Sequence, residues 1–451
     1  MQALNLISHS PDDVVARLSQ RREAIPKTAD VVIVGGGIMG LASAYYLSKR
    51  GLAVVVVEKD KIASQQSGRN WGFVRKLYRD SAELPLALKA LQQWGSLEQE
   101  LGYGFGWKRN GCLFLAQSEE EQSVFEQWCE ETRDIVTDAT MLGTAEVANL
   151  FPMLDDKAAP GLYTPTDGQA EPVLATYAFA RASEANKVQI LEGCGAIEIE
   201  VSNGAVSGLL TEHGYIRTPS VVCAAGAYSQ RLLRKTQLGI PQQVVRSTVS
   251  LTTPVEIFDS PCFCGYGLGM RQRADGSCII AADSDVDIDI SLDTLRGARF
   301  FLPSFLAHKS TFSLRFGKPF FDELEWRLKT RADEKMFKPR RPEIPPNTKR
   351  AERMLALFRD LFNVENQVVI AKSWAGHIDV MPDALPVLDA PSQVSGLVVA
   401  TGFSGHGFGL GPAVGSVVAD FVSGKDPDIE TKPFRLDRFR LGTYRPPHAP
   451  L

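Results

Sequence analysis

The stretch from Asp30 to Glu58 limits the fold more than any other part of the 451-residue chain. It opens with DVVIV, a run of β-branched residues of the kind found in buried strands. Three glycines follow in the spacing G-x-G-x-x-G, then an apolar helical pattern and a second β-branched run at 54–57. The sequence therefore predicts a strand, a glycine turn, a helix and a second strand in direct succession.

Each glycine of this turn has a physical role. Gly35 permits the tight turn from strand to helix, Gly37 lets the backbone approach a pyrophosphate, and Gly40 lets the helix lie close to the strand. The helix N-terminus presents backbone N–H groups and the positive end of the helix dipole to the phosphates. We expect these contacts at the first helical residues, Ile38 and Met39.

A carboxylate completes the pattern. Glu58 ends the second strand eighteen residues after Gly40, and Lys59 follows it. At this place an acidic side chain accepts hydrogen bonds from the ribose hydroxyls of an adenine dinucleotide. The stretch thus predicts a dinucleotide-binding site, and the alternative is a glycine-rich turn in another kind of α/β protein.

Charge and cysteine content argue against several other kinds of site. The net charge of −4 gives no reason to expect nucleic acid or an anionic membrane as a partner. The seven cysteines include no C-x-x-C pair, so we expect no metal site and a reducing compartment. The chain start lacks the pattern of a signal peptide, and no run of eighteen apolar residues exists. We therefore predict a cytoplasmic protein with no membrane span.

The segment after Glu58, KDKIASQQSGRNWGFVRKLYRD, is polar and carries several arginines. A loop of this composition directly behind a cofactor site is a candidate active-site segment. Arg69, Asn70, Arg75 and Arg79 are candidates for contact with phosphate, flavin or substrate, with Arg69 and Asn70 ranked ahead of Arg79, and the alternative is a solvated loop. The residues expected nearest the cofactor are Ser67, Arg69, Asn70, Trp71 and Gly72.

Two further glycine-rich turns follow predicted strands. The strand at 220–224 runs into Ala225-Gly226-Ala227, and the strand at 396–401 runs into GFSGHGFG. We also expect a strand at 367–374 and a final helix near 412–422. Between about 283 and 349 the chain is charged and irregular, which favours a surface insertion with two helices, or alternatively a subunit contact.

Together, the three glycine turns and the late segments WAGHIDVMPDALPVLD and GFSGHGF resemble the D-amino-acid oxidase superfamily of FAD-dependent oxidoreductases. This group includes glycine oxidase, sarcosine oxidase and D-amino-acid dehydrogenase. The resemblance covers about residues 30–80, 160–280 and 365–424. The first turn alone fits any dinucleotide-binding protein, whereas the combination of these segments is much more specific.

The resemblance implies an α/β fold, α+β overall, with a Rossmann-like FAD-binding domain that is discontinuous in sequence. A substrate domain built on a mixed or antiparallel sheet would accompany it. Outside these two domains, an N-terminal extension (1–27) and a C-terminal tail (425–451) are expected. The expected boundaries are 28–80, 160–240 and 365–424 for the FAD-binding domain, and 81–159 and 241–364, with the insertion at about 283–349, for the substrate domain.

The same resemblance implies how FAD would lie. Its pyrophosphate would rest on the first glycine turn, its ribose on Glu58 and its adenine near Val188, with Ala225 and Gly226 along its length. The last helix would point its N-terminus at the flavin pyrimidine, where reduction leaves negative charge. His406 would either contact the flavin or only shape the turn. The last turn would supply Gly402, Phe403, Gly405, His406, Gly407 and Phe408.

Substrates of the family are amines that carry a carboxylate. The implied reaction passes a hydride from the C–H next to nitrogen to flavin N5, giving an imine that water hydrolyses. The expected partners are a small amine or amino acid and oxygen or another electron acceptor, and a homo-oligomer is left open. The alternatives are a same-fold enzyme acting on a 2-hydroxy acid or polyol phosphate, and the flavin subunit of a larger dehydrogenase complex.

The sequence departs from the family pattern where the substrate would bind. The arginine expected after Trp-Ala-Gly is replaced by His377-Ile378-Asp379, and a lysine found in sarcosine-oxidase-like members is replaced by Gly409. No cysteine lies between 374 and 383, so we expect noncovalent FAD. His377 and Asp379 would face the amino group of a larger or secondary amine, such as an N-substituted or cyclic amino acid. Another cation would then bind the carboxylate, and the candidates are Arg69, Arg75, Arg271 and Arg273.

Overall fold

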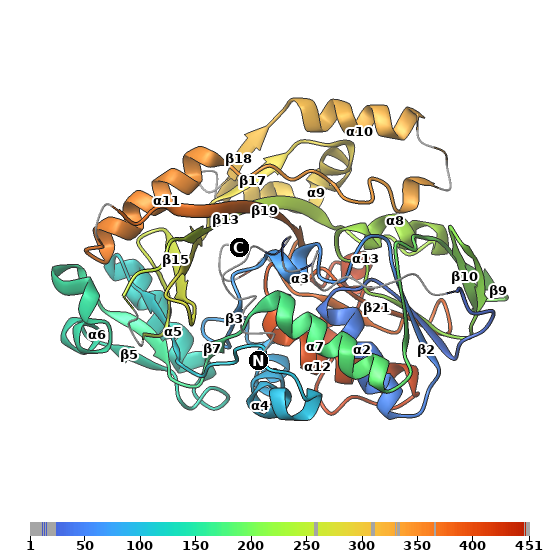
Figure 1. Ribbon diagram of the computed structural model, residues 1–451, viewed down its shortest axis with the longest axis horizontal. Helices are drawn as coiled ribbons and strands as arrows, with labels where there is room; N and C mark the ends of the chain where they lie inside the picture. The colour runs from blue at the N-terminus through green and yellow to red at the C-terminus, as the bar shows by residue number, and fades with distance from the viewer. Residues whose placement is uncertain are drawn as a thin grey trace.

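The structure is a computed structural model that describes positions 11, 13 and 15 and residues 24–256, 260–307, 312–329, 331, 334–364, 367–445 and 447. Most of the predicted N-terminal extension and part of the predicted C-terminal tail therefore lie outside the described residues. Figure 1 shows two layered parts, one with helices packed on a parallel sheet and one built around long curved strands, with a helical insertion at the top.

A six-stranded sheet carries the first glycine turn. Its strands are parallel except for β20, which pairs antiparallel to β21 at one edge. The predicted strand–helix–strand unit is present as β1, α2 (Ile38–Lys49) and β2. In spatial order the strands are β20 (Val387–Asp389), β21 (Leu397–Thr401), β12 (Val221–Cys223), β1 (Val31–Val34), β2 (Val54–Glu58) and β8 (Gln189–Glu192).

Alternate residues of the central strands face two cores. Val31 and Ile33 pack with helices on one face, whereas Val32 and Val34 pack on the other face. This alternation follows from the two-residue period of a strand and explains why β1 has no polar side. The helices of the first face are α2, α4 (Leu84–Leu101), α7 (Pro172–Ala185) and α12 (Gly407–Val422). The second face is covered by β9 (Ala196–Ser202), β10 (Ala205–Thr211) and β11 (Gly214–Arg217).

A mixed ten-stranded sheet forms the second layer, as predicted for the substrate domain. Most neighbours are antiparallel, but β14 runs parallel to β4 and β17 runs parallel to β18. Its strands are β18 (Phe312–Arg315), β17 (Val286–Asp289), β13 (Gln243–Thr252), β16 (Cys278–Ala282), β15 (Leu268–Gln272), β14 (Cys262–Gly265), β4 (Cys112–Leu115), β6 (Gly161–Thr164) and β5 (Thr140–Leu142), with β19 (Ile370–Val380) paired to β13. A small sheet joins β3 (Phe73–Val74) to β7 (Gly168–Gln169).

Two sequence-based boundaries are wrong. The strand expected at 367–374 runs from Ile370 to Val380, so the WAGHIDV motif is itself a strand, paired with β13 over its whole length. The last helix begins at Gly407, five residues before Pro412, which lies inside it. Proline is unfavourable inside a helix, so its position suggested a helix start that tertiary packing overrides. Strands β6 and β19 fall within segments assigned above to the FAD-binding domain, yet both pair in the ten-stranded sheet.

The insertion contains the two expected helices, which lie above the ten-stranded sheet in Figure 1. The remaining helices are α3 (Gln66–Arg69), α5 (Glu119–Thr132), α6 (Thr144–Leu150), α8 (Ser229–Leu233), α9 (Leu292–Ala307), α10 (Lys318–Lys329), α11 (Thr348–Leu361) and α13 (Arg438–Leu441).

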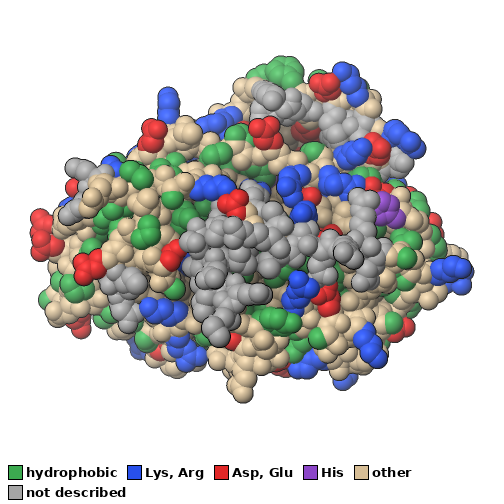
Figure 2. All heavy atoms as spheres, viewed as in Figure 1, with side chains coloured by type: hydrophobic (Ala, Val, Ile, Leu, Met, Phe, Trp, Pro, Cys, Tyr) green, Lys and Arg blue, Asp and Glu red, His purple; other side chains and the backbone are tan. Residues whose placement is uncertain are grey.

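On the face drawn in Figure 2, basic and acidic side chains are interspersed. Within the described ranges, no helix is both long and apolar enough to cross a membrane.

Candidate active site

One large cavity, of 1110 Å³, lies where the two layers meet. It is lined by residues at the carboxyl ends of β1, β2 and β12 and by strands β13 and β19. All three glycine turns reach it. The sequence-predicted residues that line it are Gly35, Gly37, Ile38, Met39, Glu58, Lys59, Ser67, Arg69, Asn70, Trp71, Gly72, Arg75, Ala225, Gly226, His377, Asp379, Phe403, Gly405, His406, Gly407 and Phe408.

The first turn is built so tightly that only glycine fits. Gly35 has φ +119°, and a Cβ there would lie 2.3 Å from the Ala224 carbonyl oxygen. Glu58 stabilises the turn, because its Oε2 accepts a 2.7 Å hydrogen bond from the Gly36 N–H and its Oε1 a 2.8 Å bond from the Asp60 N–H. Burial raises the pKa of Glu58, although these two backbone bonds oppose the shift. The carboxylate thus borders the cavity directly beside the glycine loop.

Two helix N-termini open onto the cavity. Helix α2 begins after Gly37, which has no side chain to cap it, and α12 begins after His406, which makes no capping hydrogen bond. Neither helix has an acidic residue in its first turn. The Ile38 N–H at the start of α2 donates to Ser67 Oγ at 2.9 Å. The two positive dipole ends suit an extended, negatively charged ligand. A Cβ at Gly226 would lie 2.5 Å from Gln66 Oε1, so the middle turn is closely packed as well.

Three predicted cofactor residues do not line the cavity. A Cβ at Gly40 would lie 2.0 Å from the Gly35 carbonyl oxygen, and one at Gly402 would lie 2.5 Å from Met381. Both glycines therefore allow close packing rather than contact with a ligand. Val188, expected beside the adenine, is buried in the core that covers the helical face of the six-stranded sheet. Its side chain packs in that core, so only its backbone could contact the adenine.

Asp379 is not available to a substrate amino group. Its buried carboxylate accepts hydrogen bonds from Gln66 Nε2 at 2.5 Å, Gln242 Nε2 at 2.9 Å, Thr401 Oγ1 at 3.2 Å and the Gly402 N–H at 2.9 Å. Burial raises the pKa of Asp379, while these bonds oppose the change. The residue joins all of the elements around the middle and last turns. These bonds favour a structural role for Asp379 over the expected contact with the substrate amino group, although it lines the cavity.

Two of the four candidate cations for a carboxylate are already paired. Arg271 and Arg273 both bind Glu171, each with an N–O distance of 2.9 Å, and neither lines the cavity. Burial alone would raise the pKa of Glu171, but the two arginines lower it to about 2. Arg69 donates to the backbone oxygens of Ser64 and Ala375 and so ties the loop to β19. Arg75 remains, and its guanidinium lies 5.0 Å from the Phe114 ring centre.

A buried polar cluster, which we define as Arg75, Arg79, Glu83 and His406, lines one part of the cavity. Arg79 is 4% exposed, and its Nε lies 3.6 Å from Glu83 Oε2. Nδ1 of His406 lies 3.4 Å from the same oxygen. Among the described residues, Arg79 Nη1, both Glu83 oxygens and His406 Nδ1 have no hydrogen-bond partner. Buried polar atoms of this kind need a ligand or ordered water as partner.

The sequence analysis placed Arg69 and Asn70 ahead of Arg79 as candidates for contact with cofactor or substrate, and it did not identify Glu83. Glu83 immediately precedes a helix, and an acidic residue there is usually explained by its favourable interaction with the helix dipole. It was therefore not considered as a site residue. The available signal was the spacing of four between Arg79 and Glu83. Burial lowers the pKa of Arg79 to about 9, and the charge of the nearby Arg75 adds to this. Burial alone would raise the pKa of Glu83, but Arg79 and His406 lower it.

The glycine turns around the cavity and the comparison with known sequences both indicate a dinucleotide cofactor. Residues 30–421 match the family described as DAO, FAD dependent oxidoreductase. The chain belongs to this family of FAD-dependent oxidoreductases. Its cofactor is therefore FAD, and the two-layer fold is that of the DAO flavoenzymes.

Relatives of this DAO-family chain come from several organisms. It is 26% identical over 422 residues to "Sarcosine oxidase subunit beta" of Rhizobium meliloti (strain 1021), covering 92% of this chain and 89% of that one. It is 24% identical over 426 residues to mitochondrial sarcosine dehydrogenase of Mus musculus, covering 92% of this chain but only 42% of that one. L-Amino acid deaminase from Proteus myxofaciens, solved with anthranilate, superposes with a TM-score of 0.87 at 25% identity, covering 93% and 96% of the two chains.

The two cavity histidines are neutral in the folded DAO enzyme. Burial, reinforced by nearby cations that include Lys59 and Arg246, lowers the pKa of His377 to about 4. Burial also lowers the pKa of His406 to about 4, with Arg79 adding to the shift and Glu83 opposing it. Neither imidazole therefore carries charge at neutral pH.

We expect the free energy of unfolding to fall as the pH drops from about 6.5 to 4. In this window the unfolded chain protonates its histidines near their ordinary pKa, while His377 and His406 stay neutral in the folded state. The unfolded state binds more protons, so each histidine costs up to about 3 kcal/mol of stability at acid pH. Urea unfolding at several pH values measures the slope. His377→Gln should flatten it, whereas the exposed control His213→Gln should not; equal slopes in both variants would contradict the assignment.

Proposed function

We propose that this DAO-family enzyme oxidises the C–N bond of an amino acid or secondary amine that carries a carboxylate. The implied product is an imine, which water hydrolyses. The single observation that carries the proposal is the pair of guanidinium groups of Arg75 and Arg79 on the cavity wall, with Arg79 Nη1 unpartnered. FAD, when bound, supplies the two-electron acceptor.

Charge balance in the buried polar cluster supports an anionic substrate group. Two guanidinium groups face one carboxylate, Glu83, while His406 is neutral, so the cluster carries net positive charge. Arg79 is almost fully buried and pairs with Glu83 at 3.6 Å, but its Nη1 has no hydrogen-bond partner among the described residues, and a buried unsatisfied donor is costly. A substrate carboxylate would satisfy it through two parallel N–H···O bonds, which also orient the substrate. Arg75 and Arg79 therefore take the role that sequence reasoning looked for at position 378.

Glu83 and His406 suit the amino end of the same substrate. An amino acid arrives in water as an ammonium ion, whereas hydride transfer needs a neutral amine. The ionised Glu83 and the neutral imidazole of His406 both present unpartnered acceptors at the cavity. The ionised Glu83, whose Oε2 lies 3.4 Å from His406 Nδ1, would hold the ammonium form as a counter-ion, and the amine would lose its proton to solvent before hydride transfer.

A secondary amine remains the preferred substrate. Two of the relatives are named for sarcosine, an N-methylated amino acid. Ile378 lines the cavity where the family pattern has an arginine, so this wall is apolar and suits an N-substituent or a ring. At the position of the family lysine, a Cβ on Gly409 would lie 3.2 Å from the Val74 Cα, so close packing against β3 favours glycine there.

FAD attachment is proposed to be noncovalent. Cys264 is a thiol on the cavity wall, and burial raises its pKa well above the ordinary value, so it is a poor nucleophile. Acid precipitation of the purified enzyme should therefore leave all the flavin in the supernatant. Flavin that stays with the precipitate would contradict this part of the proposal.

Anaerobic flavin bleaching tests the substrate class. The holoenzyme is mixed with N-methyl and cyclic amino acids, simple amino acids, carboxylate-free amines and 2-hydroxy acids, and loss of flavin absorbance is followed. We expect fast bleaching with carboxylate-bearing secondary amines and the slowest with carboxylate-free amines. Faster bleaching by hydroxy acids or a polyol phosphate would replace the proposal with the alternative reaction. Hydrogen peroxide release in air then separates an oxidase from a dehydrogenase.

A further inference from the structure

We propose that the insertion supplies part of the cofactor site. The segment 336–341 at its carboxyl end, called the strap below, covers the end of the cavity beside Glu58. Met336 and Phe337 line the cavity. In this proposal the strap forms the wall of the cavity around the adenosine half of FAD. FAD must move past the strap when it binds or dissociates.

The position of the strap follows from its neighbours. Glu58 ends β2, where an acidic residue binds the ribose of an adenine dinucleotide. The next residue, Lys59, donates from Nζ to the Pro339 carbonyl oxygen at 3.2 Å. Phe337 is 4% exposed and lies directly over Gly195, where a Cβ would be 2.3 Å from its ring. The aromatic ring therefore closes the cavity next to the ribose-binding carboxylate.

Charged contacts hold the strap at two places on the cofactor layer, the end of β2 and the turn between β10 and β11. Arg340 Nη2 binds both oxygens of Glu212 at 2.5 Å, and its Nη1 donates to the Lys59 carbonyl oxygen. Arg341 Nε donates to Asp60 Oδ2 at 2.8 Å. A guanidinium bound to both oxygens of a carboxylate is directional, so it fixes the strap in place.

Contacts from the middle turn complete the closure. Tyr228 donates from its hydroxyl to the Pro339 carbonyl oxygen at 3.1 Å, and Arg231 Nη1 donates to the Lys338 carbonyl oxygen at 3.0 Å. Lys59 Nζ lies 3.1 Å from the centre of the Tyr228 ring. Both Tyr228 and Lys59 line the cavity. The strap is thus held by residues that themselves border the cofactor site.

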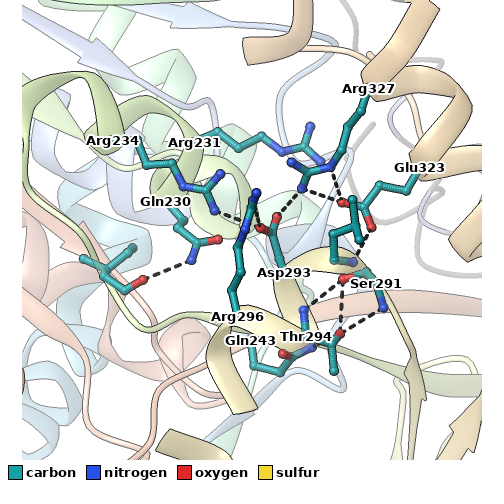
Figure 3. Close-up of polar contacts among 12 residues, drawn as sticks. Gln230, Arg231, Arg234, Gln243, Ser291, Asp293, Thr294, Arg296, Glu323 and Arg327 are labelled. Atoms are coloured by element: carbon teal, nitrogen blue, oxygen red, sulfur yellow. Dashed lines mark hydrogen bonds and ion pairs between the residues drawn. The ribbon is translucent and has the colours of Figure 1, made fainter. Parts of the chain in front are cut away.

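The helices of the insertion are bound to the same layer. Figure 3 shows Arg234, which follows α8, and Arg327 of α10 converging on Asp293 of α9. Both N–O distances are 2.8 Å, and Arg327 also binds Glu323 within α10. Several charges in one network hold their geometry better than an isolated surface pair. The insertion is therefore fixed on α8 by this network and on the β2 end by the strap.

The rate of FAD release tests the proposal without any substrate. Holoenzyme is diluted into FAD-free buffer, and the rise in flavin fluorescence gives the dissociation rate. Arg340→Ala should release FAD about tenfold faster than the wild type, because it loses the two-oxygen contact with Glu212. Phe337→Ala should do the same by opening the wall. The control Lys329→Ala removes an exposed ion pair with Glu325 in the same insertion and should leave release unchanged.

Thermal unfolding separates closure from general stability. If the strap retains FAD, the gain in Tm on FAD binding should shrink in Arg340→Ala and Phe337→Ala, while the Tm of the apoprotein changes little. Wild-type release rates in both variants, or equal Tm losses with and without FAD, would overturn the proposal. An enzyme that bleaches with no amine would count against the proposed function and leave this inference intact.

Discussion

Replacing Arg79 with glutamine is expected to lower kcat/KM for amino-acid substrates by about 100- to 1,000-fold. Removing one partner of a buried charge pair costs several kcal/mol, and every 1.4 kcal/mol corresponds to about a factor of ten. Arg79 is 4% exposed and pairs with Glu83 at 3.6 Å, and its Nη1 has no hydrogen-bond partner among the described residues, so a substrate carboxylate would give it a second anionic partner. Steady-state kinetics with a carboxylate-bearing secondary amine measures the effect.

Three comparisons make this result specific. Arg79→Lys keeps the positive charge but cannot form the bidentate hydrogen bonds of a guanidinium, so its activity should lie between those of the wild type and Arg79→Gln. Arg133→Gln, at an exposed arginine after α5, should behave as the wild type. Because the buried variant risks misfolding, perturbation of the flavin spectrum by a carboxylate inhibitor gives a second measure of binding. An equal loss of rate with a carboxylate-free amine would show that Arg79 does not bind the carboxylate.

Replacing Asp379 with alanine is expected to lower the free energy of unfolding by about 3–5 kcal/mol. The change removes the acceptor shared by donors on Gln66, Gln242, Thr401 and Gly402. Gln242 and Thr401 keep the Gly226 carbonyl oxygen as an acceptor. These groups belong to elements that meet at the cavity, so the loss should also loosen the middle and last glycine turns. Urea unfolding of the apoprotein measures the first effect, and the visible circular dichroism of the bound flavin measures the second.

The same experiment decides whether Asp379 has a structural role or contacts the substrate directly. Asp134→Ala, at an exposed aspartate, should change stability by no more than about 0.5 kcal/mol. Asp379→Asn should lie between the wild type and Asp379→Ala, since the amide keeps one acceptor oxygen. A variant Asp379→Ala with wild-type stability and no activity would instead restore the expectation of direct contact with substrate.

The cofactor site could be predicted from sequence because its determinants are local. The glycine spacing, the helix start and Glu58 all lie between residues 30 and 58, and each follows from backbone sterics or a fixed offset along the chain. The turn between β9 and β10 is equally local, since Asn203 and Gly204 both have the positive φ that such a hairpin turn requires. Helix and strand limits were less accurate where tertiary contacts compete, as at Pro412 inside α12.

The substrate side could not be predicted because its determinants are pairings between distant residues. Asp379 and Gln66 are 313 positions apart, and Arg271 is paired with Glu171, 100 positions earlier. Nothing in the local sequence distinguishes an arginine held in such a pair from one that faces a cavity. Glu83 and the strap were missed for the same reason.

The sequence by itself therefore determined that this chain has an FAD cradle, since glycines, helix dipole and ribose-binding carboxylate act through short-range geometry. Only the tertiary structure decided which charges remain unpartnered around that cradle. It assigned Asp379, Arg271 and Arg273 to internal partners and left Arg79, Glu83 and His406 with unpartnered atoms at the cavity. The physical reason is that burial and pairing, which set the chemistry of a charged group, depend on what the fold brings beside it.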